Sequence, residues 1–174
     1  MIVLKVITDG VWMSLFLSTF CNGIDKKGRV SVPASFRSAL MTQSFPGIVA
    51  FRSLEHPCIE AFGINVIEKI SQSMNGLDPI KDYSQEWAYV ICAETQQLPF
   101  DSEGRVLLPD IFYQHAQLED AVTFVGRGPT LQLWNPNIFS TQQEEMRLRF
   151  FEQRSLSKIQ TVAEISPLSR QGGI

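Results

Sequence analysis

The stretch DKKGRVSVP, residues 25–33, returns 76 residues later as DSEGRVLLP, residues 101–109. Over the windows 25–36 and 101–112, six of the twelve positions are identical. A second block follows each copy, because residues 49–62 (VAFRSLEHPCIEAF) resemble residues 122–134 (VTFVGRGPTLQLW) at an offset of 72 to 73. The blocks come in the same order both times. The sequence therefore indicates an internal duplication.

Each copy of the stretch is typical of a β-hairpin turn followed by a short helix. The glycine can adopt the positive φ of a tight turn, and the aspartate can accept local backbone N–H groups. The proline ends the returning strand and suits the first turn of a helix. The residues expected to shape the turns are Asp25, Gly28 and Pro33, and Asp101, Gly104 and Pro109.

The rest of the pattern predicts an α+β protein. We expect a strand over 14–24 with apolar residues on both faces, strands over 48–52 and 58–62, and a helix over 65–74. A break at 75–79 precedes a helical stripe formed by Tyr83, Trp87, Val90 and Ile91. Strands over 122–125 and 131–134 flank a turn at 126–129, and a last helix runs from Pro136 to about residue 164.

Composition describes an ordinary globular chain. It has 174 residues, of which 44% are hydrophobic and 19% charged, so each half alone would have a thin core. We therefore expect the halves to pack together or to exchange elements. The three cysteines are far apart, which disfavours a zinc site or a disulfide framework. We expect each cysteine side chain to be buried, and the protein to reside in a reducing cytoplasm. No apolar stretch of the sequence approaches the length of a membrane span.

Four segments follow from these patterns. Residues 1–12 are interpreted as an N-terminal extension, with Met13 as the expected start. Residues 13–75 are predicted to form a first module and residues 76–151 a second module with its leading helix. Residues 152–174 are predicted to be a helical extension and a tail.

Charge separates the two copies of the turn. The chain carries a net charge of −3, whereas residues 13–75 carry six Lys or Arg and four Asp or Glu. A two-stranded ribbon fits the major groove of DNA, and arginine can bind guanine bidentately. Lys26, Lys27, Arg29 and Arg105 are therefore the candidate DNA-binding residues. The alternative is a purely structural hairpin in which Asp25 and Arg29 pair across the turn.

The two DxxGR turns, each followed by Val-x-x-Pro, together with Leu131-Gln132-Leu133-Trp134, resemble the MraZ family of bacterial transcriptional regulators over residues 14–151. The resemblance implies two tandem AbrB/SpoVT-type modules of the swapped-hairpin β-barrel type. It also implies a ring-like homo-oligomer that binds direct repeats upstream of the division and cell-wall gene cluster, in the cytoplasm and on the nucleoid.

Carried over to this chain, the DNA-contacting signature of the family falls on Asp25 and Arg29, and on Asp101 and Arg105. The second turn departs from a basic pattern, because Ser102 and Glu103 replace the lysines. We therefore expect the first turn to contribute most of the DNA affinity, and the second to close the barrel and the ring.

Two other functions compete with DNA regulation. An antitoxin-like protein of the same fold would bind DNA and a partner protein, but residues 152–174 are short for a partner clamp. An enzyme is disfavoured, because His56 and His115 stand apart from any nucleophile and Glu144-Glu145 suits a solvated helix face. The sequence thus predicts no catalytic residue, metal, cofactor, small-molecule substrate or membrane contact.

Overall fold

The computed structural model describes residues 15–74 and 91–165, with side chains over 15–72 and 91–154. The chain divides into one unit that ends at Pro136 and a second that begins at Asn137. The predicted extension 1–12 and the Met13 start lie outside the described residues. So do the module boundary at 75/76, the helical stripe up to Val90 and the tail from 166. The division into modules therefore stays a prediction.

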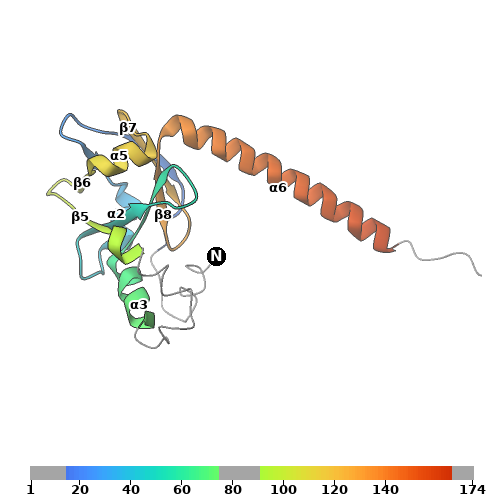
Figure 1. Cartoon of the computed structure of the whole chain (residues 1–174), viewed down its shortest axis with the longest axis horizontal. Coiled ribbons are helices and arrows are strands. Elements are labelled where there is room, and N and C mark those ends of the chain that lie inside the picture. Colours follow the sequence, from blue (N-terminus) through green and yellow to red (C-terminus); the bar gives the residue numbers. More distant parts are fainter. Residues whose placement is uncertain (1–14, 75–90, 166–174) are drawn as a thin grey trace, which may run out of the picture. The chain divides into compact units, whose positions relative to one another are not determined.

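The first unit alternates strands and short helices, which confirms the α+β class (Figure 1). Residues 91–94 are also helical. The named elements of this unit are β1 (Thr19–Gly23), β2 (Arg29–Ser31), α2 (Ala34–Leu40), β3 (Gly47–Arg52), β4 (Cys58–Phe62), α3 (Ile64–Met74), β5 (Gln96–Pro99), β6 (Arg105–Leu107), α5 (Asp110–Ala116), β7 (Ala121–Gly126) and β8 (Leu131–Trp134).

Strands from the two sequence copies pair with each other. A six-stranded antiparallel sheet has the order β1-β7-β8-β4-β3-β5, and β2 pairs with β6 in a separate two-stranded ribbon. In the large sheet, β1 of the first copy pairs with β7 of the second, and β5 of the second copy pairs with β3 of the first. The expected exchange of elements between the halves is therefore confirmed.

The strand registers correct the offset of the second repeated block. Ala50 opposes Ala61 in one half, and Phe124 opposes Leu133 in the other. Phe20 opposes Phe124, and Gln96, its equivalent at the 76-residue offset, opposes Ala50. Ala50 and Phe124 are therefore equivalent, and the matching strands are 74 and 72 residues apart, not 72 to 73 as the sequence suggests. Matching Val49 to Val122 is wrong by one position, and such a slip exchanges the two faces of a strand. The apolar run from Ile48 to Phe51 in β3 hides the alternation that would have revealed it.

One hydrophobic core joins both copies. Val30 and Val106, at equivalent positions, are both fully buried, and so are the rings of Phe36 and Phe112 at 1% exposure. Phe16 and Phe20 pack edge-on against Phe36, with ring centroids 5.3 and 5.4 Å apart. The buried residues of this core come from both copies, and Val30 opposes Val106 across the pair of β2 and β6.

The first strand departs from the sequence-based expectation. Leu15 and Leu17 are 60% and 62% exposed, so the apolar residues are not buried on both faces. Ser18 has φ 81, and β1 begins only at Thr19. This left-handed residue interrupts the strand. Phe16 still reaches the core, because an isolated bridge joins its backbone to Gly128.

A second apolar cluster lies where α3 packs on the opposite face of β3 and β4. Val66 and Ile70 of α3 contact Phe51 and Phe62 there, together with Ile91.

Cysteine burial was predicted correctly only for Cys58, since Cys21 and Cys92 are exposed. Burial raises the pKa of the Cys58 thiol to about 12, which keeps it protonated.

The second unit is the helix α6 (Pro136–Ile165), which begins one residue before the unit boundary. Its extent confirms the helix predicted to about residue 164. Glu145 and Arg149 pair at i, i+4, with Nη2 3.3 Å from Oε2. Leu148, Phe150 and Phe151 are 58% to 59% exposed. Among the described residues, no helix is both long enough and apolar enough to span a membrane.

Candidate nucleic-acid interface

The first turn, residues 25–29, is organised around one carboxylate. The Asp25 N–H donates to the Arg29 carbonyl (2.9 Å), and the Gly28 N–H donates to the Asp25 carbonyl (2.9 Å). Oδ1 of Asp25 accepts the backbone N–H groups of Lys27 (2.8 Å) and Arg29 (3.0 Å). Gly28 has φ 77, as a tight turn requires.

The second turn, residues 101–105, has the same geometry. Its two backbone hydrogen bonds measure 2.9 and 3.0 Å. Oδ1 of Asp101 accepts the N–H groups of Glu103 (2.9 Å) and Arg105 (3.0 Å), and Gly104 has φ 73. The identical positions of the repeat thus build identical loops, and the different side chains are displayed on equal scaffolds.

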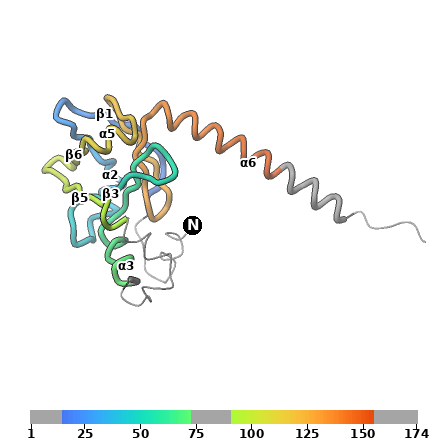
Figure 2. Tube along the Cα trace, viewed as in Figure 1, coloured from blue at the N-terminus to red at the C-terminus, as the bar shows by residue number. Residues whose placement is uncertain are grey.

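Both turns project from the same side of the first unit in Figures 1 and 2. The ribbon of β2 and β6 connects them, because the Leu108 N–H donates to the Gly28 carbonyl (3.0 Å) and the Val32 N–H to the Gly104 carbonyl (3.1 Å). Pro33 and Pro109 follow directly, with ψ 139 and 150. Each ends the ribbon and stands at the N-cap of α2 or α5.

The two arginines brace their turns rather than standing free. Nε and Nη2 of Arg29 donate to Oδ2 of Asp25 at 2.8 and 2.6 Å. Nε of Arg105 donates to Oδ2 of Asp101 at 2.8 Å. The side chains are 30% and 22% exposed. Asp25 and Arg29 thus pair across the turn, and the assignment of the arginines to DNA binding stays a prediction.

The bracing acts on both carboxylates. The Arg29 side-chain hydrogen bonds are the main cause that lowers the pKa of Asp25 to about 2. The pKa of Asp101 also falls to about 2, and there the Arg105 backbone N–H is the largest cause, followed by its side chain. Both aspartates are therefore ionised at neutral pH, and each turn holds a complete ion pair.

Each arginine has a second carboxylate nearby, and the two arginines differ in which residue provides it. Nη1 of Arg29 lies 3.7 Å from Oδ2 of Asp101, across the ribbon. Nη1 of Arg105 lies 2.7 Å from Oε2 of Glu103, within its own turn. The pKa of Arg105 is raised, chiefly by its hydrogen bond to Asp101. Its charge is thus more fully neutralised than that of Arg29.

Lys26 and Lys27 are exposed at the tip of the first turn. Neither side chain makes a hydrogen bond or ion pair with any residue that the structure describes. The corresponding positions of the second turn are the exposed Ser102 and Glu103. The structure thus brings the four predicted DNA-binding residues onto one ribbon, but it leaves only the two lysines unpaired.

Sequence reasoning missed two residues that touch the turns from the other copy. Nη1 of Arg37, on α2, donates to the carbonyls of Glu103 (3.3 Å) and Gly104 (3.4 Å). Tyr113, on α5, holds the equivalent place, and a methyl group on Gly28 would lie 3.4 Å from its hydroxyl. These residues are 76 positions apart and directly follow the repeated phenylalanine. The repeat alignment could have found them.

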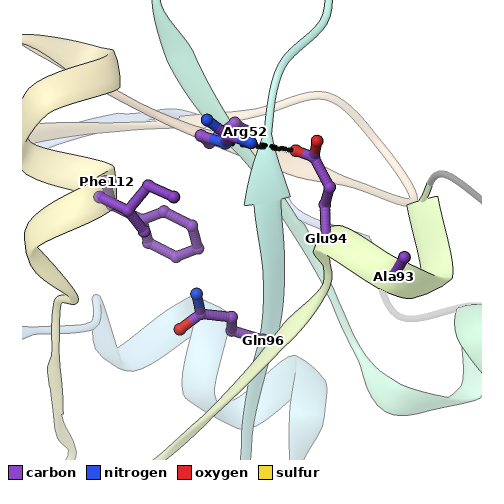
Figure 3. A pocket seen from close by; sticks show the side chains of 6 residues that line it. Arg52, Ala93, Glu94, Gln96 and Phe112 are labelled. Atoms are coloured by element: carbon purple, nitrogen blue, oxygen red, sulfur yellow. Dashed lines mark hydrogen bonds and ion pairs between the residues drawn. The ribbon is translucent and has the colours of Figure 1, made fainter.

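A cavity of about 200 Å³ is lined by residues outside the two turns (Figure 3). Arg52 and Glu94 form an ion pair at its edge, with Nη2 2.9 Å from Oε2. The lining residues are Arg52, Ala93, Glu94, Gln96, Ile111 and Phe112. These six side chains offer no nucleophile, and the charge of the arginine is already compensated.

The histidines make structural contacts. His56 lies beside the Trp134 ring, with centroids 5.7 Å apart, and Nε2 of His115 lies 3.2 Å from the His56 carbonyl oxygen. Over 15–74 and 91–165, no three His, Cys, Asp or Glu residues gather as metal ligands would.

Comparison with known proteins shows which family the chain resembles. The family model described as "MraZ protein, putative antitoxin-like" matches residues 91–157. A protein of Rickettsia canadensis (strain McKiel) named "Transcriptional regulator MraZ" is 42% identical over 142 residues, which cover 82% of this chain and 95% of that protein. A protein of the same name from Rickettsia bellii (strain OSU 85-389) is 48% identical over 128 residues, which cover 73% and 85%. The chain therefore belongs to the MraZ family.

Proposed function

We propose that this chain regulates transcription by binding duplex DNA in a sequence-specific way through its two hairpin turns. The operator would consist of the direct repeats upstream of the division and cell-wall gene cluster that the resemblance implies. A ring-like homo-oligomer would place several turns on successive repeats and raise the avidity by effective concentration. Such a protein would act in the cytoplasm, on the nucleoid, without catalysis or a cofactor.

The observation that carries this proposal is the unpaired charge of the first turn. Lys26 and Lys27 are exposed on a loop whose backbone is held by Asp25 and Arg29. A rigid loop loses little conformational entropy when its cations meet phosphates. The other candidates, for contacts nearer the bases, are Arg105, which is partly exposed, and Nη1 of Arg29, which lies 3.7 Å from Oδ2 of Asp101.

The decisive measurement is DNA affinity across a salt series. A labelled duplex from directly upstream of the protein's own gene is titrated between about 50 and 200 mM salt, where each lost phosphate contact lowers the slope of log K against log salt by about 0.9. We expect the double variant Lys26→Gln/Lys27→Gln to lower the slope by about 2 for each protomer that contacts the duplex. Arg29→Ala should cause a severe loss, because it removes a cation and the brace of Asp25, and Arg105→Ala a milder one.

Lys69→Gln provides the matched control. This lysine lies on α3, away from the turns in Figure 1, and its loss should leave the slope unchanged. A scrambled duplex of equal length measures the non-specific component. Binding that ignores both lysines and Arg29, or that shows no salt dependence, would contradict the proposal.

A second candidate function is that of an antitoxin-like protein that binds DNA and a partner protein. The exposed Leu148, Phe150 and Phe151 on α6 favour it, because apolar side chains grouped on a surface mark interaction sites. Co-expression with the proteins encoded by the adjacent genes tests it. A complex that forms with the wild type and is lost in Phe150→Ser/Phe151→Ser supports this function, and its absence with every neighbour argues against it.

A further inference from the structure

The two turns differ most in the charge that surrounds equal backbones. The first turn contains one carboxylate, that of Asp25, and three cations, Lys26, Lys27 and Arg29. In the second turn, Asp101 and Glu103 both contact Arg105, so the turn by itself has more carboxylates than cations. A loop of this kind would repel a phosphate backbone, although its geometry matches that of the first turn.

Arg37, a residue of the first copy, adds a positive charge beside the second turn. Its guanidinium lies against the second turn and covers Gly104, where a methyl group would meet Nη1, Cδ and Cζ within 2.7 Å. Its hydrogen-bond partners on the second turn are two carbonyl oxygens, which accept N–H groups without neutralising the charge. Within the described part of the chain, Arg37 forms no ion pair with a carboxylate, and its side chain is only half-buried.

We propose that Arg37 is the cation through which the second turn contacts the DNA phosphates. The inference rests on the proposed DNA binding and adds a residue outside the turn sequences. The first copy would thus supply the charge for both turns, with two lysines at its own tip and one guanidinium placed on its partner turn. The carbonyls of Glu103 and Gly104 hold the guanidinium in place, and its remaining N–H groups are available to phosphate oxygens.

Three substitutions at Arg37 and Tyr113 test the proposal with the full chain and the same upstream duplex. Arg37→Gln keeps an N–H donor for the carbonyls and removes the charge. For each protomer that contacts the duplex, we expect it to lower the salt slope by about 0.9 and the affinity about five-fold at physiological salt. The affinity for the scrambled duplex should fall by the same factor. Arg37→Lys keeps the charge and should keep the slope. Tyr113→Arg puts a guanidinium on the first turn and should raise the slope by about 0.9 for each contacting protomer.

A purely structural role for Arg37 predicts a different result. The Gln and Lys variants would then lose affinity together, with an unchanged slope and a lowered melting temperature, and that result overturns the proposal. Tyr113→Phe is the control for the helix position and should leave the slope unchanged.

The lysine variants separate this inference from the proposed function. If Lys26 and Lys27 set the salt slope and Arg37→Gln does not alter it, the inference fails alone. If the wild type shows no salt-dependent binding to either duplex, both fail.

Discussion

At the scale of single residues, one carboxylate organises each turn with both of its oxygens. Oδ1 takes two backbone N–H groups and Oδ2 takes the guanidinium, in the first turn and in the second. Asparagine could offer one oxygen and no charge, and glutamate would set the carboxylate one methylene further from the backbone. The pattern Asp-x-x-Gly-Arg therefore describes one local structure that needs all three residues.

The aspartates give the first prediction, which concerns acid stability. Their folded pKa values are about 2, below the unfolded value of about 3.9. The contribution of the two ionised aspartates to the free energy of unfolding is therefore complete above about pH 4 and is lost as the pH falls toward 2. We expect Asp25→Asn/Asp101→Asn to be less stable than the wild type at pH 7, with the difference shrinking below pH 4. Urea unfolding at several pH values measures it.

An equal stability difference at pH 7 and pH 2 would contradict the prediction. Asp110→Asn is the control, because this exposed aspartate lies outside both turns.

At the scale of elements, the two turns share a backbone and differ in what covers it. A methyl group on Gly28 would meet the Tyr113 hydroxyl and the Leu107 side chain at 3.4 and 3.5 Å, which is close to ordinary contact. A methyl group on Gly104 would overlap the Arg37 side chain at 2.3 Å. The α2 and α5 helices thus pack on equivalent turns with unequal side chains.

This difference predicts unequal effects of the same substitution. Gly28→Ala should cost about 1–2 kcal/mol, the penalty for an L-residue at positive φ. Gly104→Ala should cost about 2–4 kcal/mol, because Arg37 must also move and lose its two hydrogen bonds. Chemical unfolding of both variants measures the two costs.

A double-mutant cycle with Arg37→Ala gives the control. In that background, the cost of Gly104→Ala should fall to the cost of Gly28→Ala, since the overlapping side chain is gone. An unchanged cost would show that Arg37 is not the obstacle.

At the scale of the whole molecule, the duplication has produced one interleaved unit with local differences. Glu60 of β4 opposes Gln132 of β8, which is the equivalent residue of the other half. Nε2 of Gln132 donates to Oε1 of Glu60 at 2.6 Å. Glutamate at both positions would set two like charges side by side in a partly buried place. The divergence of the copies at this pair therefore removes a repulsion at the point where the two halves meet.

Interleaving predicts that both copies unfold together. Phe36→Ala and Phe112→Ala should each cost about 3–5 kcal/mol, because each ring is fully buried in the shared core. Hydrogen exchange should then show the same loss of protection in β1, β3, β5 and β7, whichever ring is removed. Independent modules would instead lose protection only in the copy that carries the substitution. Leu54→Ala, at a side chain 57% exposed, is the control and should change stability by less than about 0.5 kcal/mol.

Several features of the fold and the site were predictable because local chemistry decides them. The Asp-x-x-Gly-Arg turns, the prolines that end the strands, the helix over 65–74 and the long last helix depend on residues close in sequence. The offset between the equivalent strands β3 and β7 could not be predicted, because the apolar run in β3 shows no alternation of apolar and polar residues that would define the register.

The sequence alone determined that two similar turns exist, and that the first carries the greater positive charge. Only the tertiary structure decided which of those charges are free. Arg29 and Arg105 are engaged by the aspartates of the turns, Lys26 and Lys27 are not, and Arg37 reaches the second turn from 66 residues away. The physical reason is that ion pairs and close packing depend on distances in space, and here the exchanged strands bring together residues that the sequence keeps far apart.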